Sequence, residues 1–111
     1  MLGTFIGGFE GQKSGLNCTI QNGGVSIGAG GWAELANVRS EGGSAGLTNL
    51  TVIGGRIGTL SVQINFLTSS PVVFGSANTN VTVEVDFLEG GNVVTLFQVE
   101  GEPWVDAIVV G

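Results

Sequence analysis

The 111-residue sequence contains no histidine, no tyrosine and a single cysteine. Without histidine, neither a Ser–His nor a Cys–His nucleophile can form, and the usual proton carrier near neutral pH is missing. Cys18 cannot form a disulfide within the chain, and a zinc ion would find too few soft ligands. These absences predict a protein that is not an enzyme and that holds no cofactor or metal.

Positive charge is also scarce. Only Lys13, Arg39 and Arg56 are basic, against nine acidic residues, and the formal net charge is −6. Nucleic acids and anionic membranes are bound by clustered cations, so both are excluded as partners. No run approaches the roughly 18 apolar residues of a membrane-spanning helix. The N-terminus has no basic region, so we expect no signal peptide and synthesis in a host cytoplasm.

Glycine, by contrast, is abundant, with 21 residues, and apolar residues make up 42% of the chain. Such a composition is unlike that of disordered segments, which are poor in β-branched residues and rich in charge. The length fits one domain that spans residues 1–111. Within it, the first ten or so residues are apolar but interrupted by glycine, and we expect them to form an arm.

Apolar and polar residues alternate with a period of two, which is typical of antiparallel strands with one buried and one wetted face. The clearest runs cover residues 16–21, 60–66 and 81–87, and the second of these lies in a strand expected at 57–67. Weaker strands are expected at 2–6, 25–27, 47–53, 72–74, 93–100 and 104–110. Asn22-Gly23 and Gly54-Gly55 are predicted to be hairpin turns. The prediction is an all-β protein, a compact antiparallel β-sandwich or jelly-roll-like domain of about eight short strands, with a small barrel as the alternative.

One glycine-rich motif resembles a ligand-binding pattern. Gly28-Ala29-Gly30-Gly31-Trp32-Ala33 matches the dinucleotide-binding pattern, whose glycines let the backbone approach a pyrophosphate. The pattern also requires a crossover helix, and residues 32–38 are too few to form one. We therefore interpret the motif as a flexible turn, followed by a single helical turn or an irregular strand.

Acidic residues offer two further sites. Glu84 with Asp86, or Glu100 with Asp106, could act as the carboxylate pair of a glycoside hydrolase. Asp86, Glu89 and Asn92 surround a Gly-Gly turn and could hold calcium, although no complete ligand loop is present. We interpret these groups as solvated strand faces and a turn.

Two C-terminal segments, 93–97 and 104–110, are apolar on both faces and predict cover on both sides. Edge strands also lack the lysines that usually prevent self-association. We therefore expect a homo-oligomer, with a trimer favoured. The expected interface residues are Leu2, Phe5, Ile6, Phe9, Trp32, Trp104, Val105, Ile108 and Val110.

These features together predict a non-enzymatic structural protein of a virion, such as a phage capsid decoration protein that docks on a capsid or filament lattice. The alternative is a lectin-like, carbohydrate-binding β-sandwich module, in which Trp32 and Trp104 stack on sugar rings. A carboxylate-based glycoside hydrolase is the third hypothesis. Binding to sugars would discriminate the lectin-like module from the virion protein.

Overall fold

The computed structural model describes residues 4–7, 15–21 and 24–110. Nearly all of them lie in antiparallel strands, so the predicted all-β fold is confirmed. The strands are β1 (Thr4–Gly7), β2 (Gly15–Gln21), β3 (Gly24–Val38), β4 (Gly46–Ile64), β5 (Thr68–Phe74), β6 (Asn80–Phe87) and β7 (Asn92–Val110), and a short 3-10 turn, η1 (Glu41–Gly43), precedes β4. No helix in these ranges is long and apolar enough to cross a membrane.

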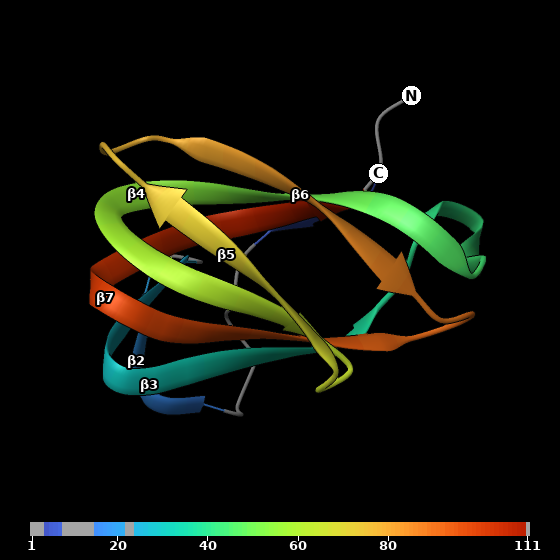
Figure 1. Ribbon diagram of the computed structural model, residues 1–111, viewed down its shortest axis with the longest axis horizontal. Helices are drawn as coiled ribbons and strands as arrows, with labels where there is room; N and C mark the ends of the chain where they lie inside the picture. Colours follow the sequence, from blue (N-terminus) through green and yellow to red (C-terminus); the bar gives the residue numbers. More distant parts are fainter. Residues whose placement is uncertain (1–3, 8–14, 22–23, 111) are drawn as a thin grey trace.

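The strands form two packed layers, because β3, β4 and β7 are long and curve at one end of the molecule (Figure 1). The β5 layer contains the second half of β3, the first half of β7, the second half of β4, and β5. The start of β3 pairs instead with the second half of β7, and β2 follows β3 along its edge. The β6 layer contains β1, the second half of β7, the first half of β4, and β6. The predicted sandwich is thus confirmed, with one continuous set of hydrogen-bonded strands folded over on itself.

The strand count differs from the prediction of about eight short strands. Seven strands are described, and Gly54-Gly55 is not a hairpin turn, because β4 runs through it from Gly46 to Ile64. Its pairing with β7 shifts register repeatedly between Ile53 and Leu60, which marks bulges that bend the strand. At Gly58 a Cβ would lie 2.8 Å from Pro103, so the crossing of β4 and β7 requires glycine there.

The core lies between the layers and is built by the alternation visible in the sequence. On β4, Leu60, Val62 and Ile64 point inward, and Val72 and Phe74 of β5 lie beside them. Val85 and Phe87 close the core from the β6 layer. Burial of this apolar surface, at about 25 cal/mol per Å², is the main stabilising contribution to the fold.

A buried amide joins the strand ends opposite the bend. The Asn92 side chain is 1% exposed and donates to the carbonyls of Val38, Leu88 and Gly90. Its Oδ1 accepts hydrogen bonds from the Leu88 N–H and from Asn65 Nδ2. Asn92 therefore links the ends of β3, β4 and β6 to the start of β7.

Candidate functional site

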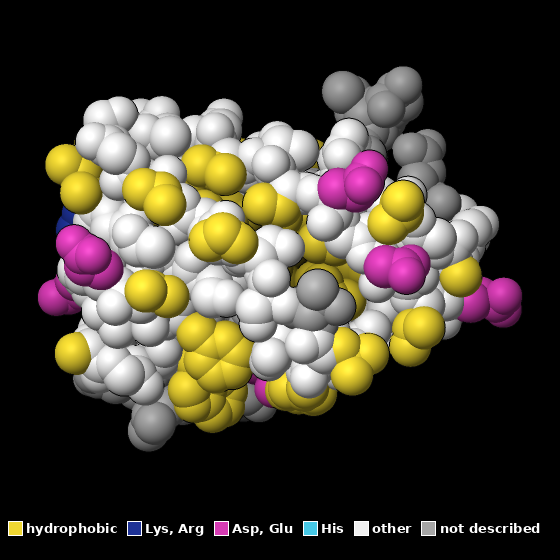
Figure 2. Space-filling view, in the orientation of Figure 1, with side chains coloured by type: hydrophobic (Ala, Val, Ile, Leu, Met, Phe, Trp, Pro, Cys, Tyr) yellow, Lys and Arg dark blue, Asp and Glu magenta, His cyan; other side chains and the backbone are white. Residues whose placement is uncertain are grey.

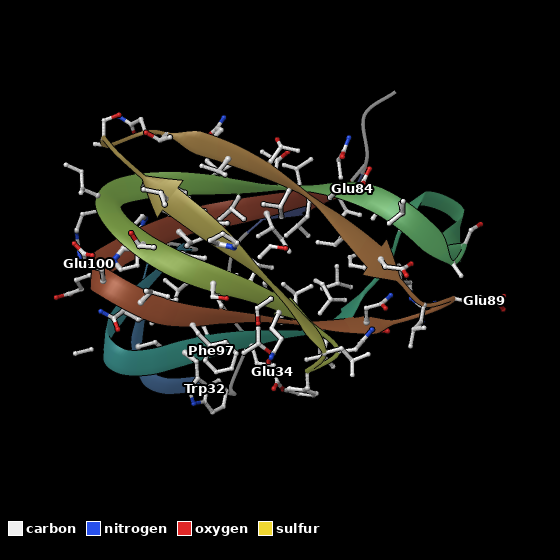
Figure 3. The ribbon with its side chains drawn as sticks, in the orientation of Figure 1. Trp32, Glu34, Glu84, Glu89, Phe97 and Glu100 are labelled. Carbon is white, nitrogen blue, oxygen red and sulfur yellow. The ribbon has the colours of Figure 1, made fainter. Side chains whose placement is uncertain are left out.

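Trp32 and Phe97 form a pair of aromatic side chains on the outer face of the β5 layer. They are direct cross-strand partners on β3 and β7, and both are half-buried. Directly opposed side chains lie about 5 Å apart, so the two aromatic groups are adjacent. Figure 3 places them side by side at the lower edge of the molecule, where Figure 2 shows exposed aromatic rings in yellow. The pair provides an apolar platform that faces solvent.

A row of hydrogen-bonding side chains runs beside this platform. Glu34 on β3 pairs with Thr95 on β7, which pairs in turn with Gln63 on β4. Two residues along a strand span about 6.6 Å, so the polar row lies at about that distance from the aromatic pair. Within the described ranges, no hydrogen bond or ion pair engages the side chain of Glu34 or Gln63. These groups remain available for a ligand.

Thr95 is the unusual member of the row. Its side chain is 1% exposed, and its hydroxyl has no hydrogen-bond partner. Strand alternation directs it away from the core, because its neighbours Val94 and Leu96 both point inward. A buried hydroxyl without a partner costs stability, and such a group calls for an explanation.

The other tryptophan belongs to a different environment. The Trp104 ring lies at the bend, where Arg56 Cζ is 5.9 Å from its centroid and its indole N–H donates to Asp106. Arg56 also forms a 3.3 Å ion pair with Glu102. Ser26 donates to the same carboxylate at 2.9 Å. This cluster satisfies its own polar groups and closes the curved end of the sandwich, so Trp32 and Trp104 do not form one site.

The remaining residues expected at an interface lie elsewhere. Val105, Ile108 and Val110 are each 0% exposed, because the apolar C-terminal segment is the central strand of the sandwich. Their burial is accounted for within one chain, which corrects the assignment of these three residues to a subunit interface. Phe5 and Ile6 lie on β1, whose backbone pairs with β7, and Leu2 and Phe9 lie outside the described residues. The expected homo-oligomer stays a prediction.

The acidic residues of the two suggested pairs are exposed, and the two pairs lie on different strands, β6 and β7. Glu84 and Asp86 project from β6 beside a hollow of about 280 Å³ whose walls include Leu47, Leu67 and Leu88. Asn92, expected near them as a calcium ligand, is engaged with backbone groups instead. Among the described residues, no group of three acidic or cysteine side chains is arranged to hold a metal ion.

The glycine-rich motif forms a bend. Residues 28–31 lie within β3, where its pairing with β7 shifts register between Ser26 and Trp32. The motif therefore turns the strand and delivers Trp32 to the outer face, as part of a strand and not of a helix. Cys18 packs against the core, and burial raises the pKa of its thiol above the ordinary value of 9.0.

Sequence reasoning singled out Trp32 but missed Phe97, Glu34, Thr95 and Gln63. Segment 93–97 was interpreted as apolar on both faces, although Val93, Thr95 and Phe97 share the outer one. That alternation is the signal that could have found them. The pairing with Trp32 is a long-range contact, and no local pattern shows it.

No protein-family model and no curated protein sequence matches this chain. Solved structures with the same fold do match. A CBM35 from Paenibacillus barcinonensis superposes with a TM-score of 0.79 at 20% identity, over 98% of each chain. The C-terminal CBM6 of the marine laminarinase LamC from Zobellia galactanivorans gives 0.76 at 17% identity, over 97% of this chain and 98% of that one.

The same fold occurs within longer chains. An exo-β-1,3-galactanase from Phanerochaete chrysosporium matches with a TM-score of 0.78 at 20% identity, covering 100% of this chain but only 30% of its own. At such identities the likeness establishes the fold. It also contradicts the prediction of a phage or viral capsid decoration protein, because the matching structures are carbohydrate-binding modules and glycosidase chains. That prediction was wrong because few charges and strands that are apolar on both faces occur at the centre of a sandwich as well as at a subunit interface.

Proposed function

We propose that this protein is a non-catalytic carbohydrate-binding module that holds a glycan on the outer face of its β5 layer. The observation that carries the proposal is the adjacent pair Trp32 and Phe97 beside the row Glu34, Thr95 and Gln63. The shared fold with CBM35 and CBM6 structures supports it.

The chemistry of sugars matches this arrangement. A pyranose ring has faces of C–H groups that pack on the electron-rich face of an aromatic ring, and hydroxyls around its edge that need hydrogen-bond partners. Binding sites commonly combine apolar or aromatic walls with a few placed polar groups. The aromatic pair provides the first element, and the carboxylate and amide of the polar row provide the second.

The proposal that the module is non-catalytic has its own support. The chain has no histidine. Asp106, a member of one suggested acid pair, accepts a hydrogen bond from the Trp104 indole. The other pair, Glu84 and Asp86, lies on β6, in the layer opposite the aromatic platform. The glycan would be held without being cleaved.

The test is binding to a panel of glycans named after the substrates of the matching proteins: laminarin, β-1,4-mannan, β-1,3-galactan and xylan. Affinity electrophoresis and calorimetry should detect binding to at least one. Trp32→Ala and Phe97→Ala should each weaken it by tenfold or more, since a well-packed aromatic contact is worth about 1.4 kcal/mol or more. Phe66→Ala is the matched control, because Phe66 is 58% exposed but lies in the β4–β5 turn. Binding to none of the glycans, or equal loss in the control, contradicts the proposal.

A further inference from the structure

We propose that this face accepts uncharged glycan chains and rejects glycans that carry carboxylate or sulfate groups, and that Glu34 is the residue that determines this specificity. The inference rests on the carbohydrate-binding function proposed above and adds the charge class of the ligand. It follows from the charges on the face, from the hydrogen-bonding capacity of Glu34, and from the unpartnered hydroxyl of Thr95.

The only charge in the two rows of the face is negative. Among the described residues of both rows, Glu34 alone is ionisable, and it lies two positions from Trp32 on the same face of β3. The described cations lie elsewhere: Arg56 is paired with Glu102 at the bend, and Arg39 donates to Asn37 beyond the end of β3. Among the described residues, no cation lies in these rows to compensate Glu34, so an anionic group on the platform would meet its charge in the field of a chain with net charge −6.

Glu34 is suited to neutral sugars because its carboxylate only accepts hydrogen bonds. Glycan hydroxyls donate such bonds, and bonds to an ionised acceptor are stronger than those between neutral groups. Gln63, across the row, both donates and accepts. A ligand carboxylate in the same position offers no hydrogen to Glu34 and adds a like charge.

Thr95 provides the second, independent observation. Its hydroxyl lies between Glu34 and Gln63 in the strand register, and it is buried without a partner. Valine would fill nearly the same volume without that cost, so the hydroxyl destabilises the free protein. A sugar docked in the row supplies the missing partner once the side chains that cover the hydroxyl move aside, and such a loss of stability in exchange for function is common at binding sites.

The experiment uses laminarin, β-1,4-mannan and β-1,3-galactan, each before and after oxidation of part of its primary hydroxyls to carboxylates. For wild type at low salt, we expect roughly tenfold tighter binding of the neutral form, the size that like charges at this range produce. Glu34→Gln should reduce this preference to about twofold by removing the repulsion. Glu84→Gln, a control on β6, should leave the preference unchanged. Equal preference in wild type and Glu34→Gln, or tighter binding of the oxidised form by wild type, overturns the inference.

Thr95→Val separates a role in the site from a role in the fold. We expect its melting temperature to rise and its affinity for the neutral glycan to fall by about tenfold, the equivalent of one hydrogen bond. Thr95→Ser should keep the affinity. A more stable Thr95→Val variant with unchanged affinity overturns the role of Thr95. If no glycan binds, or if Trp32→Ala binds glycans as tightly as wild type, the proposed function itself fails. If binding requires Trp32 but the preference for neutral glycans is the same with and without Glu34, only this inference fails.

Discussion

The ring of Trp104 lies so close to Gly55 that a Cβ built on this glycine would come within 2.5 Å of Trp104 Cδ1. On another side, a Cβ on Gly24 would come within 2.6 Å of the same ring. Two backbone segments, on β3 and β4, thus contact the indole at the point where the long strands change layer. This contact explains why the bend is rich in glycine.

Gly55→Ala should therefore destabilise the fold. Overpacking of this kind costs about 1–3 kcal/mol, because the ring or the backbone has to move. Chemical denaturation followed by tryptophan fluorescence measures the change. Gly75→Ala is the matched control, since a Cβ there meets no atom within 4 Å. Equal stability of the two variants would contradict the close packing at the bend.

Asn92→Ala should be among the most destabilising polar substitutions. Its loss leaves three carbonyls and an amide N–H without their partner at the junction of four strands, at a cost of about 2–4 kcal/mol. Asn49→Ala changes an exposed side chain on β4 and should shift stability by less than about 0.5 kcal/mol. Urea unfolding curves of both variants check this. A small effect at Asn92 would show that the amide does not hold the strand ends together.

Cys18 predicts a pH dependence. Burial raises the pKa of the folded thiol, so the folded state keeps its proton to a higher pH than the unfolded state does. The stability that results is fully present below the unfolded pKa and is lost as pH rises through the folded pKa. Unfolding free energy should thus fall more between pH 8 and pH 10.5, roughly the range of thiol ionisation, in wild type than in Cys18→Ala. Identical pH profiles would mean that the thiol is solvated.

Particular residues show how far the sequence determines the fold. The alternation of Leu60, Val62 and Ile64 predicts an inward-facing strand, and all three are buried. Gly54-Gly55 was misread because a glycine pair favours a hairpin turn and a bulge alike. Pairing with distant β7 decides between them, and that information is not local.

The site was less accessible to prediction for the same reason. Trp32 was named as an interface residue and, in the alternative, as a residue that stacks on sugar rings, but its partner Phe97 lay in a segment interpreted as apolar on both faces. The burial of Val105 and Ile108 likewise depends on the pairing of β7 with strands on both sides. The alternation of apolar and polar residues predicts which face of a strand is buried. Which strand lies beside it depends on the topology of the whole sheet, which no local pattern shows.

The most direct test of the carbohydrate-binding face uses the indole N–H signals of the two tryptophans in a two-dimensional NMR titration with the glycan panel. Trp32 lies on the platform, whereas the Trp104 indole is hydrogen-bonded to Asp106 at the bend. The account predicts that a binding glycan shifts the Trp32 signal in a saturable manner and leaves the Trp104 signal in place. A shift of Trp104 alone, or no shift of either signal with any glycan, would contradict it.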